Sequence, residues 1–233
     1  MMPSSRTKRR FHAELDLLQA RLMEMSGMAE DLVARAVEAF LTRDPAARDA
    51  IRADDRAIDS LEIEIDEQAL ELIALHQPVA MDLRQILTTL KICNDIERVG
   101  DHAVNIAKAA RRAARLPPLP ETTEMEELAV LSQRMLRDAL AAFGARNSAL
   151  AREVCTRDDR VDDMRKTVRA LLLELMMNEP ARIPSALEFL RASQQLERIG
   201  DLSTNISEDV VFLVEGRSIK HNTERREDDE DSA

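Results

Sequence analysis

Apolar residues recur every three or four positions along most of the chain, which is the spacing of one face of an α-helix. Proline and short polar segments interrupt this pattern: Pro45 follows Asp44 as a helix start, and Pro78 and Pro180 fall where a helix has to end. The longest run, of about 35 residues, would span roughly 50 Å, which predicts an elongated molecule. We predict six long helices, over about residues 8–42, 45–77, 79–115, 125–143, 148–177 and 185–214.

A proline-rich segment, Leu116 to Pro120 (LPPLP), separates three predicted helices from three. Because short turns connect the helices within each group, neighbouring helices should run antiparallel. The sequence therefore predicts an all-α fold of two pseudo-repeated antiparallel three-helix bundles, at residues 1–116 and 121–218. The remaining segment, 219–233, carries a dense run of acids and is predicted to be a disordered tail.

A ten-residue stretch occurs twice, as ERVGDHAVNI at 97–106 and as ERIGDLSTNI at 197–206, and six of the ten positions are identical. Such a match at one fixed offset indicates an internal duplication. Residues four apart share a helix face, where two like charges are mildly unfavourable. Each copy has such a pair of acids, namely Glu97 with Asp101 and Glu197 with Asp201.

A second pair of acids lies on the helix preceding each copy, namely Asp55 with Asp59 and Asp158 with Asp162. In an antiparallel hairpin that turns near Pro78, Asp59 and Glu97 should sit at the same height. Each half would then present four carboxylates at one level, and clusters of oxygen ligands suit hard cations. We predict a site for divalent or trivalent metal ions in each half, without a choice among iron, zinc, magnesium and manganese. Gly100 and Gly200 lie between the acids, where a helix-interior glycine costs about 1 kcal/mol relative to alanine.

Two other interpretations of these acids stay open. They could form a solvated helix face, or they could belong to a carboxylate-bridged metalloenzyme. Di-iron bundle enzymes use Glu-x-x-His spacing, which these helices lack, and His102 is replaced by Leu202 in the second copy, which favours a polar flank over a ligand. Because the chain also lacks a Gly-rich phosphate loop, we expect a protein that is not an enzyme.

Composition narrows the choice of partners and compartment. A net charge of −11, with no Trp and no Tyr, argues against a nucleic-acid partner. No apolar stretch reaches the ~18 residues of a membrane span. Cys93 and Cys155 are isolated and fit small core residues better than a disulfide. These features predict a soluble, cytoplasmic protein.

Four segments together carry a resemblance to the PhoU family, namely DDRAID, QPVAMDLRQILTTLKICNDIERVGDHAVNIAK, DDRVDDM and ERIGDLSTNISEDVVFLVEGRSIKH. The resemblance covers about residues 8–221. It implies a cytoplasmic, non-catalytic protein, often a homodimer, that acts as a negative regulator of phosphate uptake and of phosphate-starvation signalling. The implied partners are the ATPase of the phosphate ABC transporter and a phosphate-sensing histidine kinase.

The same resemblance implies metal clusters of iron, zinc or magnesium at the paired acids. The positions that match the family motif are Asp55, Asp59, Glu97, Asp101, Asp158, Asp162, Glu197 and Asp201. The second half departs from the pattern at Gln194, Gln195, Leu202 and Arg182, so its site resembles the family's less closely. An accessory protein of a different transporter is the alternative within this family.

Overall fold

The computed structural model of the chain describes residues 5–120 and 123–220. The helices of these ranges are α1 (Ser5–Leu41), α2 (Ala47–His76), α3 (Ala80–Ala113), α4 (Thr123–Ala145), α5 (Ser148–Cys155), α6 (Asp158–Asn178), the short 3-10 helix η1 (Pro180–Arg182) and α7 (Ile183–Glu215). No strand occurs in the described ranges, and the all-α prediction is confirmed. The predicted tail at 219–233 lies outside the described residues apart from Ile219 and Lys220.

Helix ends fall close to the predicted positions. Asp44 accepts a hydrogen bond from the backbone N–H of Ala46 at 2.8 Å, just before α2 begins. Gln77 takes a left-handed conformation with φ of 47° and ends α2 directly before Pro78. Gly216, with φ of 75°, ends α7 in the same way. These local signals set the hairpin turns and therefore the height at which facing helices meet.

The fifth predicted helix is not continuous. A turn at Thr156 and Arg157 divides it into α5 and α6. Neither proline nor glycine occurs there, so the helical periodicity alone predicts an unbroken helix. Arg157 pairs with Asp138 of α4, which holds the turn against the neighbouring helix. As a result, Asp158 lies at the very start of α6.

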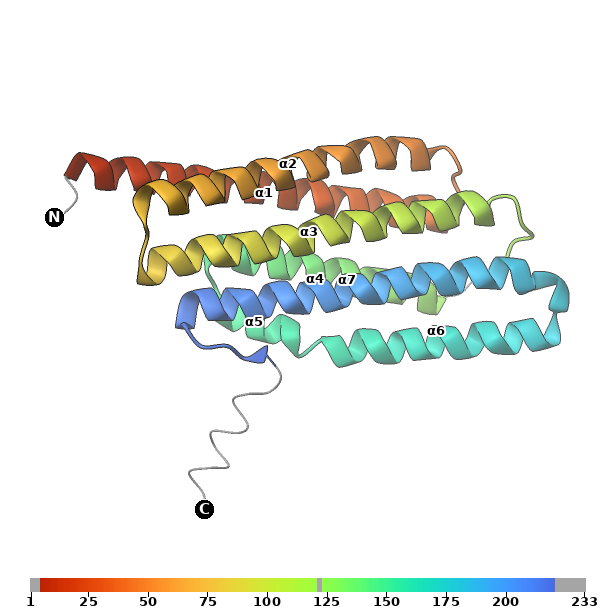
Figure 1. Cartoon of the computed structure of the whole chain (residues 1–233). Coiled ribbons are helices and arrows are strands. Elements are labelled where there is room, and N and C mark those ends of the chain that lie inside the picture. The colour runs from red at the N-terminus through yellow and green to blue at the C-terminus, as the bar shows by residue number, and fades with distance from the viewer. Residues whose placement is uncertain (1–4, 121–122, 221–233) are drawn as a thin grey trace, which may run out of the picture.

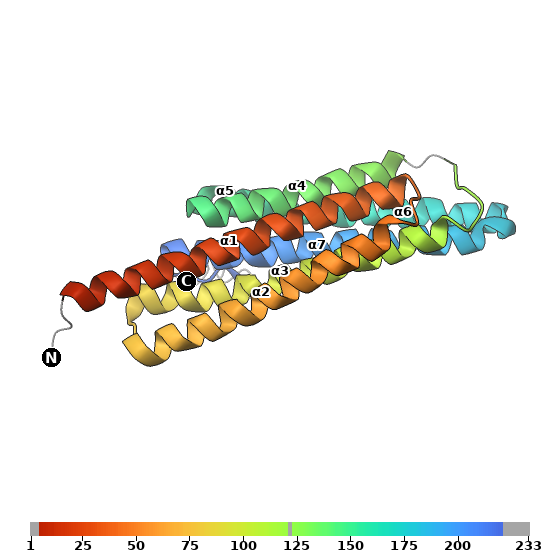
Figure 2. The ribbon, with the colours of Figure 1, turned by 90° about the horizontal axis from the view of Figure 1, so that it is seen from above.

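Each half is an antiparallel arrangement of three helical columns: α1, α2 and α3 in one half, and α4, α5 with α6, and α7 in the other (Figure 1). The halves join where α3 packs against α7 and where α1 packs against α4. Seen from above, the helices run roughly along one long axis and give an elongated body (Figure 2). The predicted pair of antiparallel bundles is confirmed.

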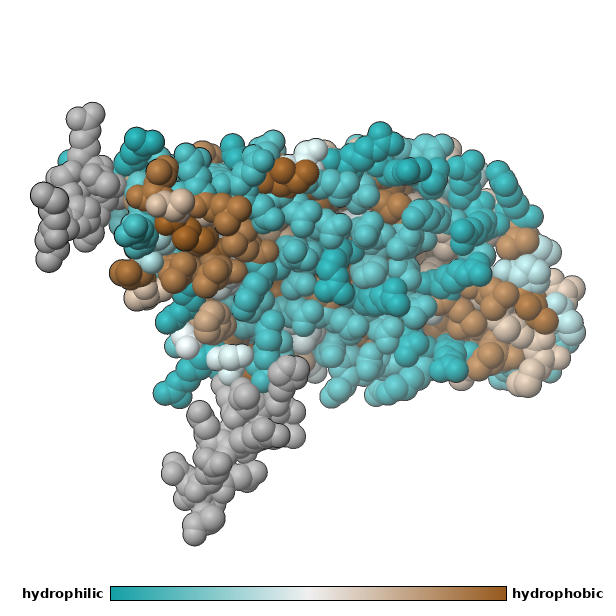
Figure 3. Space-filling model, in the orientation of Figure 1, coloured by the Kyte–Doolittle hydropathy of each residue, from teal (hydrophilic) through white to brown (hydrophobic). Residues whose placement is uncertain are grey.

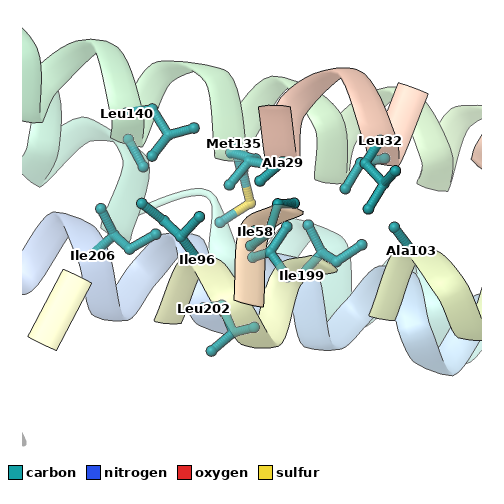
Figure 4. Close-up of a cluster of buried hydrophobic side chains, with 14 of the residues drawn as sticks. Ala29, Leu32, Ile58, Ile96, Ala103, Met135, Leu140, Ile199, Leu202 and Ile206 are labelled. Carbon is teal, nitrogen blue, oxygen red and sulfur yellow. The ribbon is translucent and has the colours of Figure 1, made fainter. Parts of the chain in front are cut away.

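One hydrophobic core runs through both halves. Ile58 and Ile96 of the first half and Met135 and Ile199 of the second belong to one buried cluster (Figure 4). These side chains are almost completely shielded from solvent, so each contributes about 1.5–3 kcal/mol of hydrophobic burial. The central helices α3 and α7 therefore pack on the helices of their own half and on each other, which holds the carboxylate-bearing helices in fixed register.

Exposed apolar side chains gather at the two ends of the molecule, over the α2–α3 connection and over the α6–α7 connection (Figure 3). Val79 and Met81 are 74% and 61% exposed at the first end, and Met177 is 76% exposed at the second. The surface between them is largely hydrophilic in this view. In the described ranges, no helix has the length and apolar character needed to cross a membrane.

Candidate metal centre

The four predicted acids of the first half come together where α2 faces α3. Asp55 and Asp59 extend from α2, and Glu97 and Asp101 extend from α3. Asp55 lies close enough to Asp59 and Asp101 for their charges to interact, and Glu97 interacts with Asp101, Asp59 and Asp55. The antiparallel hairpin thus brings the two pairs to the same height, as their equal separation from the α2–α3 turn predicts. We call these four residues the first-half cluster.

Burial and mutual repulsion make this cluster favour protonation. Burial raises the pKa of Asp55 to about 6, and the negative charges of Asp59 and Asp101 add to the rise. Burial likewise raises the pKa of Glu97 to about 7, and the negative charges of Asp101 and Glu62 add to the rise. Carboxylates that are costly to ionise gain stability from a bound cation, because the cation removes the repulsion that raises their pKa.

Three acids of this cluster, Asp55, Asp59 and Asp101, line a cavity of about 380 Å³. Its lining consists of Arg52, Asp55, Arg56, Asp59, Asp101, Val104 and Lys108. Asp55 also leans over the backbone of α3, because a Cβ added at Gly100 would stand 2.8 Å from Asp55 Oδ1. A side chain at position 100 would occupy the place of the carboxylate. The glycine thus has a steric purpose here, which offsets its unfavourable helix propensity.

The second half brings its four predicted acids together between α6 and α7, and we call them the second-half cluster. Asp201 interacts with Asp158, Glu197 and Asp162, and burial together with these charges raises the pKa of Asp201 to about 6. Burial also raises the pKa of Asp158, although a hydrogen bond from the Thr204 hydroxyl, 3.1 Å from Asp158 Oδ1, opposes the rise. The structure therefore groups all eight predicted acids into two clusters of four.

The sequence analysis did not predict three neighbours of these clusters, namely Glu62, Arg165 and Thr204. Glu62 interacts with Glu97 and Asp59, so it adds a fifth carboxylate to the first half. Arg165 forms an ion pair with Glu197, with 2.8 Å between Nε and Oε1. Glu62 and Arg165 each follow the second acid of a pair by three residues, so extending the helix-face argument by one turn would have found them.

His102 lies in the seam between α3 and α7. Its Nδ1 is 2.9 Å from Gln195 Oε1, and Asn105 donates to the same oxygen at 3.3 Å. Burial lowers the pKa of His102, which favours a neutral ring. The imidazole thus links the two halves, and this contact accounts for a histidine that the second copy of the repeat does not need.

A second seam contact involves Asp209 of α7, whose side chain is only 2% exposed. Lys91 of α3 and Lys220 approach its Oδ1 at 3.4 Å and 3.3 Å. Lys220 follows α7 in the chain, and its side chain turns back to this helix. Asp209 thus ties α3, α7 and the segment after α7 together. A cavity of about 430 Å³ next to it includes Asn94, Asp95 and Asn205 in its lining.

The chemistry of the first-half cluster suits a hard cation. All donors are carboxylate oxygens, the cavity is open to an ion, and Gly100 leaves room for Asp55. Within residues 5–120 and 123–220, no three His, Cys, Asp or Glu side chains already converge closely enough to hold an ion as they stand. Coordination would therefore draw the acids together by rotamer changes, which the exposed side chains of Asp59 and Asp101 can make.

The PhoU domain family matches residues 22–110 and 125–210, one match in each half. A phosphate-specific transport system accessory protein PhoU homolog from Clostridium acetobutylicum is 37% identical over 93% of this chain and 99% of its own length. A homolog of the same description from Pseudomonas aeruginosa is 36% identical over 91% of this chain and 88% of its own.

Solved structures show the same fold. The crystal structure of PhoU from Pseudomonas aeruginosa superposes with a TM-score of 0.86 at 35% identity and covers 89% of this chain and 100% of that one. The phosphate transport system regulatory protein PhoU from Streptococcus pneumoniae gives a TM-score of 0.83 at 27% identity, covering 90% and 99%. The similarity therefore extends over both halves and over the helices that carry the acids.

Proposed function

The chain belongs to the PhoU family, and from this premise we propose that it is the accessory protein of a phosphate-specific transport system, acting as a cytoplasmic regulator and not as an enzyme. The observation that carries the proposal is the family match in each half, spanning both carboxylate repeats. The curated relatives at about 36% identity bear the name of this accessory protein, and they align along almost their whole length.

The proposed action is negative regulation. In phosphate-replete cells the protein restrains uptake through the phosphate ABC transporter and keeps the phosphate-starvation response silent. It does so as an adaptor between the transporter's ATPase and a phosphate-sensing histidine kinase. The two apolar ends support an adaptor, because exposed apolar patches are typical of protein-binding surfaces and they lie at opposite hairpin tips. Homodimerisation is part of the proposal.

The metal part of the proposal assigns the acids a structural task. Asp55, Asp59, Glu97 and Asp101 would hold a divalent or trivalent cation, and Asp158, Asp162, Glu197 and Asp201 are the corresponding candidates in the second half. A bound cation supplies positive charge between two helices. The chain's own residues would then fix α2 against α3 and reduce the repulsion between their acids, which stabilises the native state by mass action.

The regulatory proposal is tested by deleting the gene in the organism that encodes it and measuring alkaline phosphatase in phosphate-replete medium. High activity in the deletion strain, reversed by the wild-type gene, is the expected result. Unchanged activity would refute a negative regulator of the phosphate response and would point to an accessory protein of another transporter.

The metal part has its own test, which is the metal content of the purified protein measured by mass spectrometry. The double variant Asp55→Asn, Asp101→Asn should lose bound metal. Asp54→Asn is the matched control, because Asp54 lies on the same helix but pairs with Arg35 on another face, 2.7 Å away. Full metal content in the double variant would contradict the assignment of these ligands.

A further inference from the structure

We infer that the two halves balance their carboxylates in different ways: the first half requires an external multivalent cation, whereas the second half carries its own cation, the guanidinium of Arg165. The inference rests on the proposed metal binding and adds which half performs it. Arg165 is then the residue that decides how many sites the protein has, and Glu62 is its counterpart in the first half.

Sequence register makes Glu62 and Arg165 equivalent. The pair Asp55 and Asp59 reappears 103 residues later as Asp158 and Asp162. The same shift carries Glu62 to Arg165. At one position of the duplicated helix, the chain therefore holds an acid in one half and a base in the other, which is a change of two charge units.

Contacts within the second-half cluster show what the base does. Arg165 Nε lies 2.8 Å from Glu197 Oε1, and the two side chains are only 28% and 18% exposed. The hydroxyl of Thr204 donates to Asp158 at 3.1 Å. Two of the four acids in this half thus already have a positive or hydrogen-bonding partner supplied by the chain.

The first-half cluster lacks both partners. Glu62 lies near Glu97 and carries the same negative charge. The position equivalent to Thr204 is Val104, which has no hydroxyl group to donate a hydrogen bond. The cationic side chains Arg52, Arg56 and Lys108 line the same cavity as the acids, and the charges of Lys108 and Arg52 oppose the rise in the pKa of Asp55. Lys108 Nζ donates to Asn105 at 2.9 Å. In the described part of the chain, no ion pair joins any of these three cations to the five carboxylates of α2 and α3, whereas Arg165 contacts Glu197 directly.

The surroundings of the two repeat glycines, Gly100 and Gly200, also differ between the halves. A Cβ at Gly100 would meet Asp55 Oδ1 at 2.8 Å, whereas a Cβ at Gly200 would meet Val161 Cγ1 at 3.2 Å. In the first half a carboxylate leans across the glycine, next to the cavity. In the second half an apolar side chain lies nearest that position. The space beside the glycine is thus lined by an oxygen ligand only in the first half.

A reciprocal charge swap in the full chain tests the inference. Wild type, Glu62→Arg and Arg165→Glu are each stripped with EDTA and titrated with Mn²⁺, with bound metal counted by mass spectrometry and affinity measured by calorimetry. We expect Glu62→Arg to weaken Mn²⁺ binding by roughly ten- to hundred-fold. We expect Arg165→Glu to add sites and about double the bound metal, as the second half then copies the first. Arg165→Lys, which keeps the charge, should retain the wild-type count.

A metal-free measurement separates this inference from the proposal it rests on. In EDTA at low salt, Glu62→Arg should raise the melting temperature and Arg165→Glu should lower it, and both shifts should shrink in 1 M salt because screening shortens the range of the charges. Circular dichroism verifies that each variant is helical.

The outcomes are distinct. If the wild type binds no Mn²⁺, the metal part of the proposed function fails, and opposite melting shifts still establish Arg165 as the internal counter-ion. If the wild type loads both halves equally, or if the two swaps shift the melting temperature in the same direction, the inference is overturned while the proposed function stands.

Discussion

Replacing Gly100 with alanine tests the packing of the first-half cluster directly. Gly100 lies inside α3, and the new Cβ would stand 2.8 Å from Asp55 Oδ1 and 3.4 Å from Ile58 Cδ1. Gly27 provides a matched control inside α1, because outside its own helix backbone and chain neighbours nothing lies within 4 Å of a Cβ built there. The two substitutions make the same chemical change in two different surroundings.

The size of the effect follows from two opposing contributions. Replacing glycine by alanine in a helix interior gains about 1 kcal/mol, and Gly27→Ala should show this gain in full. At Gly100 the Asp55 side chain has to leave its rotamer, which costs about 0.5–1.5 kcal/mol and cancels the gain. The two variants should therefore differ by about 1 kcal/mol, which corresponds to roughly 2–4 °C in melting temperature for a chain of this size.

Thermal unfolding in EDTA, followed by circular dichroism, measures this difference. A Mn²⁺ titration of the same samples adds a functional readout, since a displaced Asp55 should weaken binding in Gly100→Ala and leave Gly27→Ala unchanged. The reasoning is refuted if Gly100→Ala is stabilised as much as Gly27→Ala and binds Mn²⁺ with wild-type affinity. That result would mean that Asp55 does not depend on the space left by the glycine.

Three further predictions concern stability. In the metal-free protein, the pKa of Glu97 at about 7, above its ordinary 4.5, means that the folded state holds this proton more tightly. The resulting stabilisation is fully present below pH 4.5 and is lost as the pH rises through about 7. The melting temperature of Glu97→Gln should therefore fall less across this pH range than that of the wild type. An equal fall in melting temperature would contradict the raised pKa. Asp209→Asn should cost about 1–3 kcal/mol in urea unfolding, because Lys91 and Lys220 lose their buried partner, whereas no loss would mean that this seam contact is dispensable. Ile199→Ala should cost about 2–5 kcal/mol in the same assay, since Ile199 is fully buried, and a cost below 1 kcal/mol would contradict the shared core.

Local interactions explain why so much of the helical plan could be predicted. A helix depends on residues three or four apart, so its apolar face, its start at Asp44 and its end before Pro78 are all readable along the chain. The same applies to the acidic pairs, because residues four apart on one helix have to share a face. Once the short turns made neighbouring helices antiparallel, the height of Asp59 relative to Glu97 followed as well.

The break between α5 and α6 shows where local reasoning ends. Neither proline nor glycine lies near Thr156, and the turn is held by the pairing of Arg157 with Asp138, which is 19 residues away in the sequence. The spacing of apolar residues along one helix carries no information about such a contact between two helices. The first-half counterpart, α2, continues without a break.

Spacing along the chain was enough to predict the helices, the duplication and the acids that each helix presents, because each of these depends on residues within one helix. What the acids face depends on contacts between helices. The tertiary structure placed Arg165 against Glu197 and Glu62 near Glu97, and it buried both halves in one core. The physical reason is that charge balance and burial depend on which helix faces meet, and that is set by packing over the whole molecule.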